Sequence, residues 1–311
     1  MTQVNMQQVK ELRDRTQAGL NDCRSALVEA AGDMEKAVEI ILKKGLAKSA
    51  KRAGAIATEG LVIARVAADA KSGVLVEVNI QTDFAARNAE FVKFAETVAD
   101  VAMKAKAGAD LGAETFPGSS DTVEATRQAL VGKLGENITV RRWERVSIDG
   151  PGAVKSYVHM GGKIGVLLAA RVPNDAAVKS PALTKFLEDT AMQTAAMSPL
   201  YLSPSEVPAD AKQKQSEIFE AQLAEEGKTP PAARPKIIEG KIAKWMKEVC
   251  LLEQQSVLES DKSVDDLRKA LSKELGGDVT ISRFARFQCG EGIDKPTGDD
   301  FAAEVAKMAG G

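Results

Sequence analysis

The sequence predicts an α+β protein: a small helical region, followed by a core in which one unit of strands and helices occurs twice. Apolar side chains recur at helical spacing near the N-terminus, whereas apolar, β-branched runs bounded by glycine recur in the middle of the chain. That middle part also resembles itself after a shift of 92 residues, which places Gly73 on Gly165. A chain of 311 residues is long enough for two or three domains, each with its own core.

Three short helices are expected within residues 1–45. Val9 and Leu12 give the first helix an apolar side. The second helix has four small or apolar residues at helical spacing: Cys23, Ala26, Leu27 and Ala30. Asp33 is placed to cap the third helix, and Gly45 is expected to end it, because glycine readily adopts the backbone conformation that terminates helices.

Residues 43–54, KKGLAKSAKRAG, are basic and rich in small residues. We interpret them as a solvated linker, and the alternative is an arm that binds nucleic acid. The whole chain has 42 Lys+Arg against 44 Asp+Glu, which leaves a net charge of −2 and no general positive field for nucleic acid. Aromatic residues make up only 4% of the chain, so few side chains can stack on bases. Direct nucleic-acid binding is therefore not expected.

A buried strand is expected at residues 74–80, and a helix capped by Asn88 follows it. The apolar residues of this helix fall at helical spacing: Phe91, Phe94, Ala95, Val98 and Ala102. Between strand and helix lies a polar loop with one aromatic residue, made of Gln81, Thr82, Asp83 and Phe84. Functional residues concentrate on loops held between rigid elements, so residues 81–84 are the first candidate site.

The repeat continues through this loop to a closing strand. At a shift of 92 residues Asp83 coincides with Asp175, and at a shift of 141 residues Arg142 coincides with Arg283. The closing strands are expected at residues 138–146 and 279–287. We infer two copies of one α+β unit, each with a strand pair, helices and a closing strand.

The second copy serves as an internal control for the candidate loop. It keeps the aspartate as Asp175 but has Ala176 where the first copy has Phe84. It also has Asn174 in place of Thr82. The aspartate is therefore equally well explained as a cap of the loop or of the helix start. The phenylalanine is not needed to build the corner, so we expect it to be exposed and to act as a wedge for another protein.

The two shifts differ by 141 − 92 = 49 residues, which is extra material in the second copy, within about residues 197–262. Apolar residues at helical spacing predict an antiparallel helical hairpin there: Ile238, Ile242, Trp245, Val249 and Leu252. The hairpin is expected either to pack on its own body or to form a dimer or partner contact. A short C-terminal helix with Phe301, Val305 and Met308 is expected to dock on the body or on a partner.

No arrangement of residues typical of an active site is found. His159 is the one histidine, and without a catalytic partner it is expected at the surface or in an interface. The three cysteines are far apart in sequence and are expected as core residues or free thiols, not disulfides. Walker, Rossmann and G-x-S-x-G patterns are all missing. A carboxylate site near Asp83 is the enzymatic hypothesis that remains, and neither a cofactor nor a metal is expected.

No apolar run approaches the roughly 20 residues that a membrane helix needs. The N-terminus, MTQVNMQQVKELRDR, is too polar for a signal peptide. The sequence therefore predicts a cytoplasmic protein without a membrane partner.

Three stretches resemble the translation elongation factor Ts family: QTDFAARN, TQAGLNDCRSALVEAAGDMEKAVEIILKKG and GEGIDKPTGDDFAAEVAKM. The resemblance covers essentially the whole chain and implies five parts. These are a ubiquitin-associated-like domain with its linker (1–54), core subdomain N (55–148), core subdomain C (149–196 and 263–289), a helical dimerisation or coiled-coil insert (197–262) and a C-terminal module (290–311).

The activity of that family is guanine nucleotide exchange on elongation factor Tu, which needs protein binding and no active-site chemistry. The resemblance implies that Asp83 and Phe84, with Thr82 before them, intrude into the GTPase domain of elongation factor Tu. There they would disturb the Mg²⁺ and phosphate site that the GTPase holds. The insert implies a homodimer or a 2:2 complex.

The resemblance implies further contacts with elongation factor Tu. Arg24 matches a basic residue of the N-terminal domain that is usually lysine. Leu20 and Asn21 stand where the family often has two methionines. His159 matches a histidine that touches the third domain of the GTPase.

Overall fold

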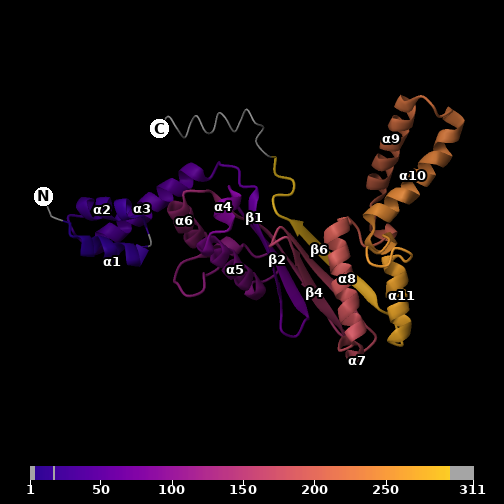
Figure 1. Ribbon diagram of the computed structural model, residues 1–311, viewed down its shortest axis with the longest axis horizontal. Helices are drawn as coiled ribbons and strands as arrows, with labels where there is room; N and C mark the ends of the chain where they lie inside the picture. Colours follow the sequence, from indigo (N-terminus) through magenta and orange to yellow (C-terminus); the bar gives the residue numbers. More distant parts are fainter. Residues whose placement is uncertain (1–3, 17, 295–311) are drawn as a thin grey trace.

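The computed structural model describes residues 4–16 and 18–294, and the predicted α+β class is confirmed. Three helices come first: α1 (Met6–Thr16), α2 (Leu20–Glu29) and α3 (Met34–Arg52) (Figure 1). Their shared core contains the residues predicted for it: Val9, Leu12, Cys23, Ala26, Leu27 and Ala30. Asp33 caps α3 as predicted, because its side chain accepts a hydrogen bond from the backbone N–H of Lys36.

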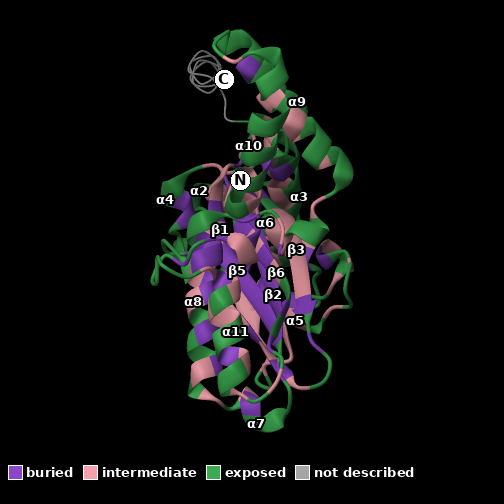
Figure 2. Cartoon of the chain, turned by 90° about the vertical axis from the view of Figure 1, so that its right-hand side faces the viewer, coloured by how far each residue is buried: buried purple, intermediate pink, exposed green. Residues whose placement is uncertain are grey.

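Two three-stranded antiparallel sheets form the centre of the molecule. The first sheet has the order β1 (Glu59–Val66), β2 (Ser72–Ile80), β3 (Ile138–Ser147). The second has the order β4 (Gly152–His159), β5 (Ile164–Arg171), β6 (Thr280–Gln288). Helices α5 (Ala89–Lys104) and α6 (Val123–Leu134) cover the outer face of the first sheet, and α8 (Pro181–Met197) and α11 (Val264–Glu274) cover that of the second. Within this arrangement of four layers the middle strands β2 and β5 are the most buried, whereas β3 is mostly of intermediate burial (Figure 2).

The elements of the first unit recur in the second. Each middle strand leads into a one-turn helix, α4 (Asp83–Ala86) after β2 and α7 (Asp175–Val178) after β5. Asn88 caps α5 as predicted, by accepting a hydrogen bond from the backbone N–H of Glu90. A β-bulge interrupts both sheets at the equivalent point, after Glu77 in β2 and after Ala169 in β5. The sequence repeat is therefore a repeat of structure, irregularities included.

The two sheets pack face to face through a reciprocal contact of glycine and leucine. A Cβ atom on Gly73 would lie 2.9 Å from Cδ2 of Leu167, and a Cβ atom on Gly165 would lie 3.1 Å from Cδ2 of Leu75. Gly73 and Leu75 are the counterparts of Gly165 and Leu167, so the contact indicates approximate two-fold symmetry between the units. A side chain at either glycine would collide with side chains of the facing sheet.

Glu77 is a charged group at the centre of the first sheet, and its side chain is completely buried. It accepts hydrogen bonds from Arg141 at 2.9 Å, from Arg142 at 2.5 Å and from the backbone N–H of Gly290 at 2.7 Å. Burial alone would raise the pKa of Glu77, but the Gly290 amide and the two guanidinium groups together hold that pKa below its ordinary value. The carboxylate thereby joins β2, β3 and the segment that follows β6.

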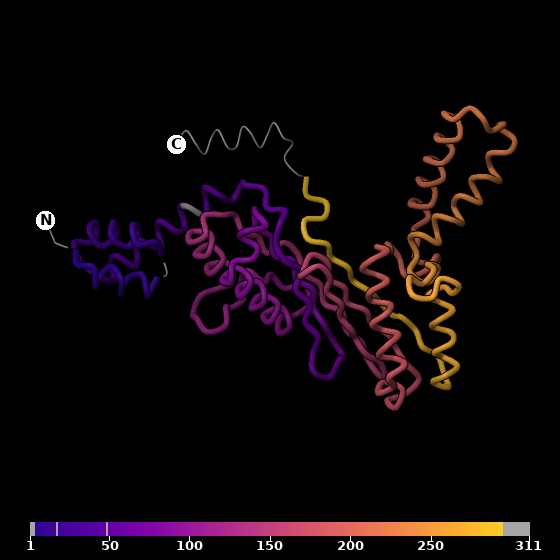
Figure 3. Tube along the Cα trace, viewed as in Figure 1, coloured from indigo at the N-terminus to yellow at the C-terminus, as the bar shows by residue number. Residues whose placement is uncertain are grey.

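The predicted insert is a hairpin of α9 (Ala209–Glu226) and α10 (Arg234–Val249), which projects from the core (Figure 3). Each helix buries one apolar side chain, Leu223 and Ile242. The predicted apolar stripe extends beyond the helix, because α10 ends at Val249 and Leu252 lies in a 3₁₀ turn. The short 3₁₀ turns of the described residues are η1 (Leu111–Ala113), η2 (Pro204–Glu206), η3 (Pro231–Ala233) and η4 (Leu251–Glu253).

The prediction for the end of the third helix was wrong. Helix α3 continues through Gly45 to Arg52, so most of the expected linker at residues 43–54 is helical. The helix packs against α6, and a Cβ atom on Gly132 would lie 2.8 Å from Cα of Gly45. Gly45 therefore lies where two helices cross closely and does not act as a stop signal.

The five-part division of the chain stays a prediction. The predicted C-terminal helix with Phe301, Val305 and Met308 lies outside the described residues.

We expect Glu77→Gln to lower the free energy of unfolding by about 3–5 kcal/mol, because it leaves two guanidinium groups beside a buried neutral side chain. A carboxylate whose pKa is lowered by folding stabilises the fold above its unfolded pKa, and this stabilisation is lost as pH falls through the folded value. Wild type should therefore lose stability as pH falls below the ordinary glutamate value of 4.5, and Glu77→Gln should lose less.

Chemical denaturation at several pH values measures both effects. The exposed Glu225→Gln at the end of α9 is the matched control and should behave as wild type. Equal stability of Glu77→Gln and wild type at neutral pH would contradict the assignment.

Candidate partner-binding surface

The loop predicted at residues 81–84 contains the one-turn helix α4. Thr82 is its N-cap, since its side-chain oxygen accepts a hydrogen bond from the backbone N–H of Ala85 at 3.2 Å. One interpretation of the sequence made Asp83 the cap of this helix, and the structure shows Thr82 in that position instead. Asp83 occupies the first helical position and pairs with Arg87 at 3.2 Å, where both side chains are largely exposed. An exposed pair of this kind adds little stability, and Asp175 occupies the same position in α7.

Phe84 is 85% exposed, the largest exposed fraction among the large apolar side chains that the structure describes. The next two residues, Ala85 and Ala86, are buried and fix α4 to the core. The ring of Phe84 consequently stands out from a helix whose other side is packed. An aromatic ring in this position is available to enter a pocket on another protein.

Glu136 holds the start of α4 in place and was missed in the sequence. Its carboxylate accepts hydrogen bonds from the backbone N–H of Thr82 at 3.0 Å and from the Thr82 hydroxyl at 2.8 Å. Next to it, the backbone N–H of Asn137 donates to the side chain of Gln81 at 2.8 Å. The repeat contained a signal: the counterpart of Glu136 is Gly277, so this support is specific to the copy that has the phenylalanine.

His159 is the last residue of β4 and is exposed. A groove of about 360 Å³ runs over β1 between the α4–α5 region, represented by Ala86 and Arg87, and the turn from β4 to β5, represented by Val158 and Gly162. Val158 lines this groove, whereas its neighbour His159 does not. The Nδ1 of His159 lies 3.1 Å from the hydroxyl of Tyr157, and the two rings stack.

The remaining predicted contact residues lie elsewhere. Leu20, Asn21 and Arg24 are exposed on α2, whereas Cys23 and Leu27 of the same helix are buried. Figure 1 shows α2 at one end of the molecule, away from α4. The structure thus places Thr82, Asp83 and Phe84 at α4, His159 at the end of β4 and the α2 residues on a separate surface.

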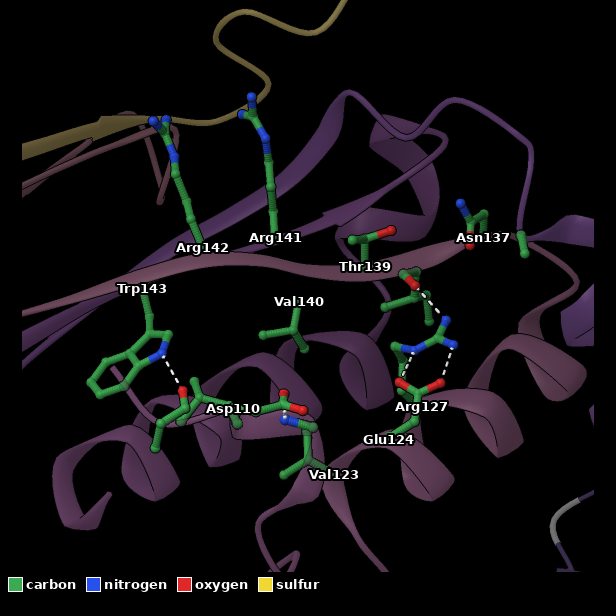
Figure 4. A pocket seen from close by; sticks show the side chains of 15 residues that line it. Asp110, Val123, Glu124, Arg127, Asn137, Thr139, Val140, Arg141, Arg142 and Trp143 are labelled. Atoms are coloured by element: carbon green, nitrogen blue, oxygen red, sulfur yellow. Dashed lines mark hydrogen bonds and ion pairs between the residues drawn. The ribbon is translucent and has the colours of Figure 1, made fainter. Parts of the chain in front are cut away.

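A recess of about 450 Å³ between β3 and α6 offers no comparable function (Figure 4). Its Arg127 pairs with Glu124 at 2.6 Å and donates to the backbone carbonyl that opens β3. In the second unit Arg268 makes the same bonds to Asp265 and to the backbone before β6. Because both copies share the arrangement, these charges serve the fold.

The described residues contain no cluster of histidine, cysteine or acidic side chains that could hold a metal ion. The three cysteines are free, as predicted: Cys23, Cys250 and Cys289. Burial raises the pKa of the Cys250 and Cys289 thiols to about 11, so neither is activated as a nucleophile. Among the helices of residues 4–294, none combines the length and apolar character that crossing a membrane requires.

Residues 81–291 match the family model described as elongation factor TS, and this match includes α4, Glu136 and His159. The chain is 46% identical over 309 residues to elongation factor Ts of Clostridium perfringens (strain SM101 / Type A), with 99% of each chain covered. It is 45% identical over 310 residues to elongation factor Ts of Trichlorobacter lovleyi, again with 99% of each covered. The chain belongs to the elongation factor Ts family. Membership of this family gives it a role in translation elongation.

Phe84→Ala should change the free energy of unfolding by no more than about 0.5 kcal/mol, because an exposed ring contributes little to the fold. Phe91→Ala, in α5 and completely buried, is the matched control and should lower the free energy of unfolding by about 3–5 kcal/mol. Thermal or denaturant unfolding compares them. A loss of several kcal/mol in Phe84→Ala would assign the ring a structural role.

Glu136→Ala should loosen α4 without unfolding the core. Loss of the Glu136 carboxylate removes two hydrogen bonds to a charged acceptor. We expect the free energy of local opening of α4 to fall by about 1.5 kcal/mol, which is roughly a tenfold rise in the opening equilibrium. Amide hydrogen exchange of residues 82–86 measures this opening, with β2 as the internal reference and Glu225→Ala as the control. Unchanged exchange in α4 would show that Glu136 does not support it.

Proposed function

We propose that the chain is a guanine nucleotide exchange factor that binds elongation factor Tu and promotes release of GDP. The observation that supports this most directly is the 85% exposed ring of Phe84 on a helix anchored by Thr82 and Glu136. Membership of the elongation factor Ts family supports the identity of the partner. The exchange factor would act in the cytoplasm, where translation elongation takes place.

Exchange by this route requires no chemistry in the chain itself. A protein that binds the nucleotide-free GTPase more tightly than the GDP-bound form must weaken GDP binding by the same factor. Mg²⁺ bridges the phosphates and is a large part of the charge that holds them. A wedge that displaces the groups around Mg²⁺ therefore favours loss of the nucleotide. The cofactors of the reaction, GDP and Mg²⁺, belong to the partner.

Phe84 and Asp83 have different tasks in this proposal. The ring of Phe84 enters an apolar site between helices of the GTPase domain and supplies the binding energy of the wedge. Asp83 is exposed and its one ion pair, with Arg87, is weak, so its carboxylate can exchange that partner for a polar group of the GTPase. Thr82 and Glu136 keep both side chains in place before the partner arrives.

Other surfaces add contacts to the same partner. Leu20, Asn21 and Arg24 form a second contact on α2, which we assign to a ubiquitin-associated-like domain. His159, exposed at the end of β4, forms a third. The hairpin of α9 and α10 projects from the core, which supports its use as a contact for a second copy of the chain.

Release of a fluorescent GDP analogue from elongation factor Tu tests the proposal. Wild type should accelerate release strongly, and Phe84→Ala should reduce this acceleration by about 30-fold or more, the loss expected when a hot-spot residue worth about 2 kcal/mol is removed. Leu258→Ala removes another exposed apolar side chain, 53% exposed in the second unit, and should leave the rate unchanged.

Two outcomes would contradict the proposal in different ways. If wild type accelerates release and Phe84→Ala equals it, the wedge is wrong and Asp83 or the other contacts must carry the effect. If wild type has no effect on elongation factor Tu, the exchange activity itself is wrong.

A further inference from the structure

Two glycines meet where α3 crosses α6. Both lie inside helices, where glycine is disfavoured relative to alanine, so each needs a reason to be there. The crossing supplies the reason for Gly132: a Cβ atom added to it would lie 2.8 Å from Cα of Gly45 and 3.3 Å from its carbonyl oxygen. One turn further along α3, Ser49 is also buried. The second half of α3 is thus docked on the core.

At this crossing only one of the two glycines lacks room for a side chain. A Cβ atom added to Gly45 would meet nothing within 4 Å, although Gly45 is the residue that Gly132 touches. The same chemical change, one added methyl group, is therefore blocked on α6 and unobstructed on α3. This asymmetry provides a matched pair of variants.

The residues just after α6 contact both the segment that follows α3 and the start of α4. Asn137 donates from its side chain to the backbone carbonyl of Ala55, just after α3, at 2.8 Å. The adjacent Glu136 holds Thr82 and therefore α4. A segment of a few residues after α6 consequently fixes the chain that leaves the helical domain and the helix that bears Phe84.

Helix α3 has 19 residues and is about 28 Å long. Its first half forms part of the N-terminal helical core, and its second half lies on α6. A continuous helix docked in this way holds α2 at a defined distance from α4. Two contact surfaces held rigidly engage one partner at a high effective concentration, and less freedom is lost on binding than with a flexible linker.

We propose that Gly132 is a positioning residue: the absence of a side chain at Gly132 lets α3 dock on α6, and this docking sets the α2 surface for simultaneous contact with α4. The inference rests on the proposed exchange function, since it assigns both surfaces to one partner. In this proposal α3 is a rigid connection between the α2 surface and α4, in place of a flexible linker.

Amide hydrogen exchange of the free, full-length protein tests the docking without any partner. Gly132→Ala should lose protection in residues 49–52 of α3 and keep that of β2. Gly45→Ala should keep the protection of wild type in both. Unchanged protection in Gly132→Ala, or an equal loss in Gly45→Ala, would overturn the docking role of Gly132.

The exchange assay on elongation factor Tu tests the positioning. Gly132→Ala should raise the concentration of exchange factor that gives half-maximal GDP release about tenfold and leave the maximal rate unchanged, because α4 is intact. Arg24→Ala should have the same effect, and the double variant should be no worse than either. The proposal would be overturned if the effects of the two substitutions were additive. It would also be overturned if Gly132→Ala reached half-maximal GDP release at the same concentration as wild type.

Two further outcomes are a Gly132→Ala variant whose core is disturbed and a wild type that does not accelerate GDP release. If Gly132→Ala also loses protection in β2, the variant Lys43→Pro is used in its place. Proline at position 43 breaks α3 between the helical domain and the crossing, and this substitution leaves α6 unchanged. It should give the same tenfold change, and an unchanged half-maximal concentration would overturn the proposal. If wild type itself does not accelerate release, the exchange function fails, whereas the docking is still decided by hydrogen exchange.

Discussion

The contact between the two sheets determines where the other parts of the molecule lie. Packed sheets usually stand about 10 Å apart because side chains fill the space between them. At Gly73 and Gly165 each sheet instead receives a leucine of the other. This approach brings the β4–β5 turn beside β1, where the backbone N–H of Val62 donates to the carbonyl of Gly162 at 2.7 Å. The groove between that turn and α4 is a direct result, so the surface assigned to the partner depends on two absent side chains.

Duplication accounts for the fold, and the differences between the copies mark what is specific to each. Three of the differences between the units concern residues described above: Phe84 against Ala176, Glu136 against Gly277 and Glu77 against Ala169. Two of these changes concern the exposure and support of one aromatic ring. The third replaces a small apolar residue by a buried carboxylate that ties the two units together.

Local features were predictable from the sequence because their causes are local. The caps Asp33 and Asn88, the strand at 74–80 and the repeat itself follow from short-range spacing, and the structure has them where expected. Gly45 misled the prediction because a glycine that ends a helix and a glycine at a helix crossing look alike in sequence. Glu136 and the groove were out of reach for a different reason. Both depend on residues that are distant in the chain and meet only after the sheets have packed.

The hairpin of α9 and α10 leaves the core and returns to it at one point. Tyr201 and Cys250 form a parallel bridge there, and the backbone N–H of Leu251 donates to the carbonyl of Tyr201 at 2.9 Å. The two ends that an insert must join are thus held side by side, and the entropy of closing a loop grows only slowly with its length. Selection can therefore lengthen, shorten or replace this segment without disturbing either sheet.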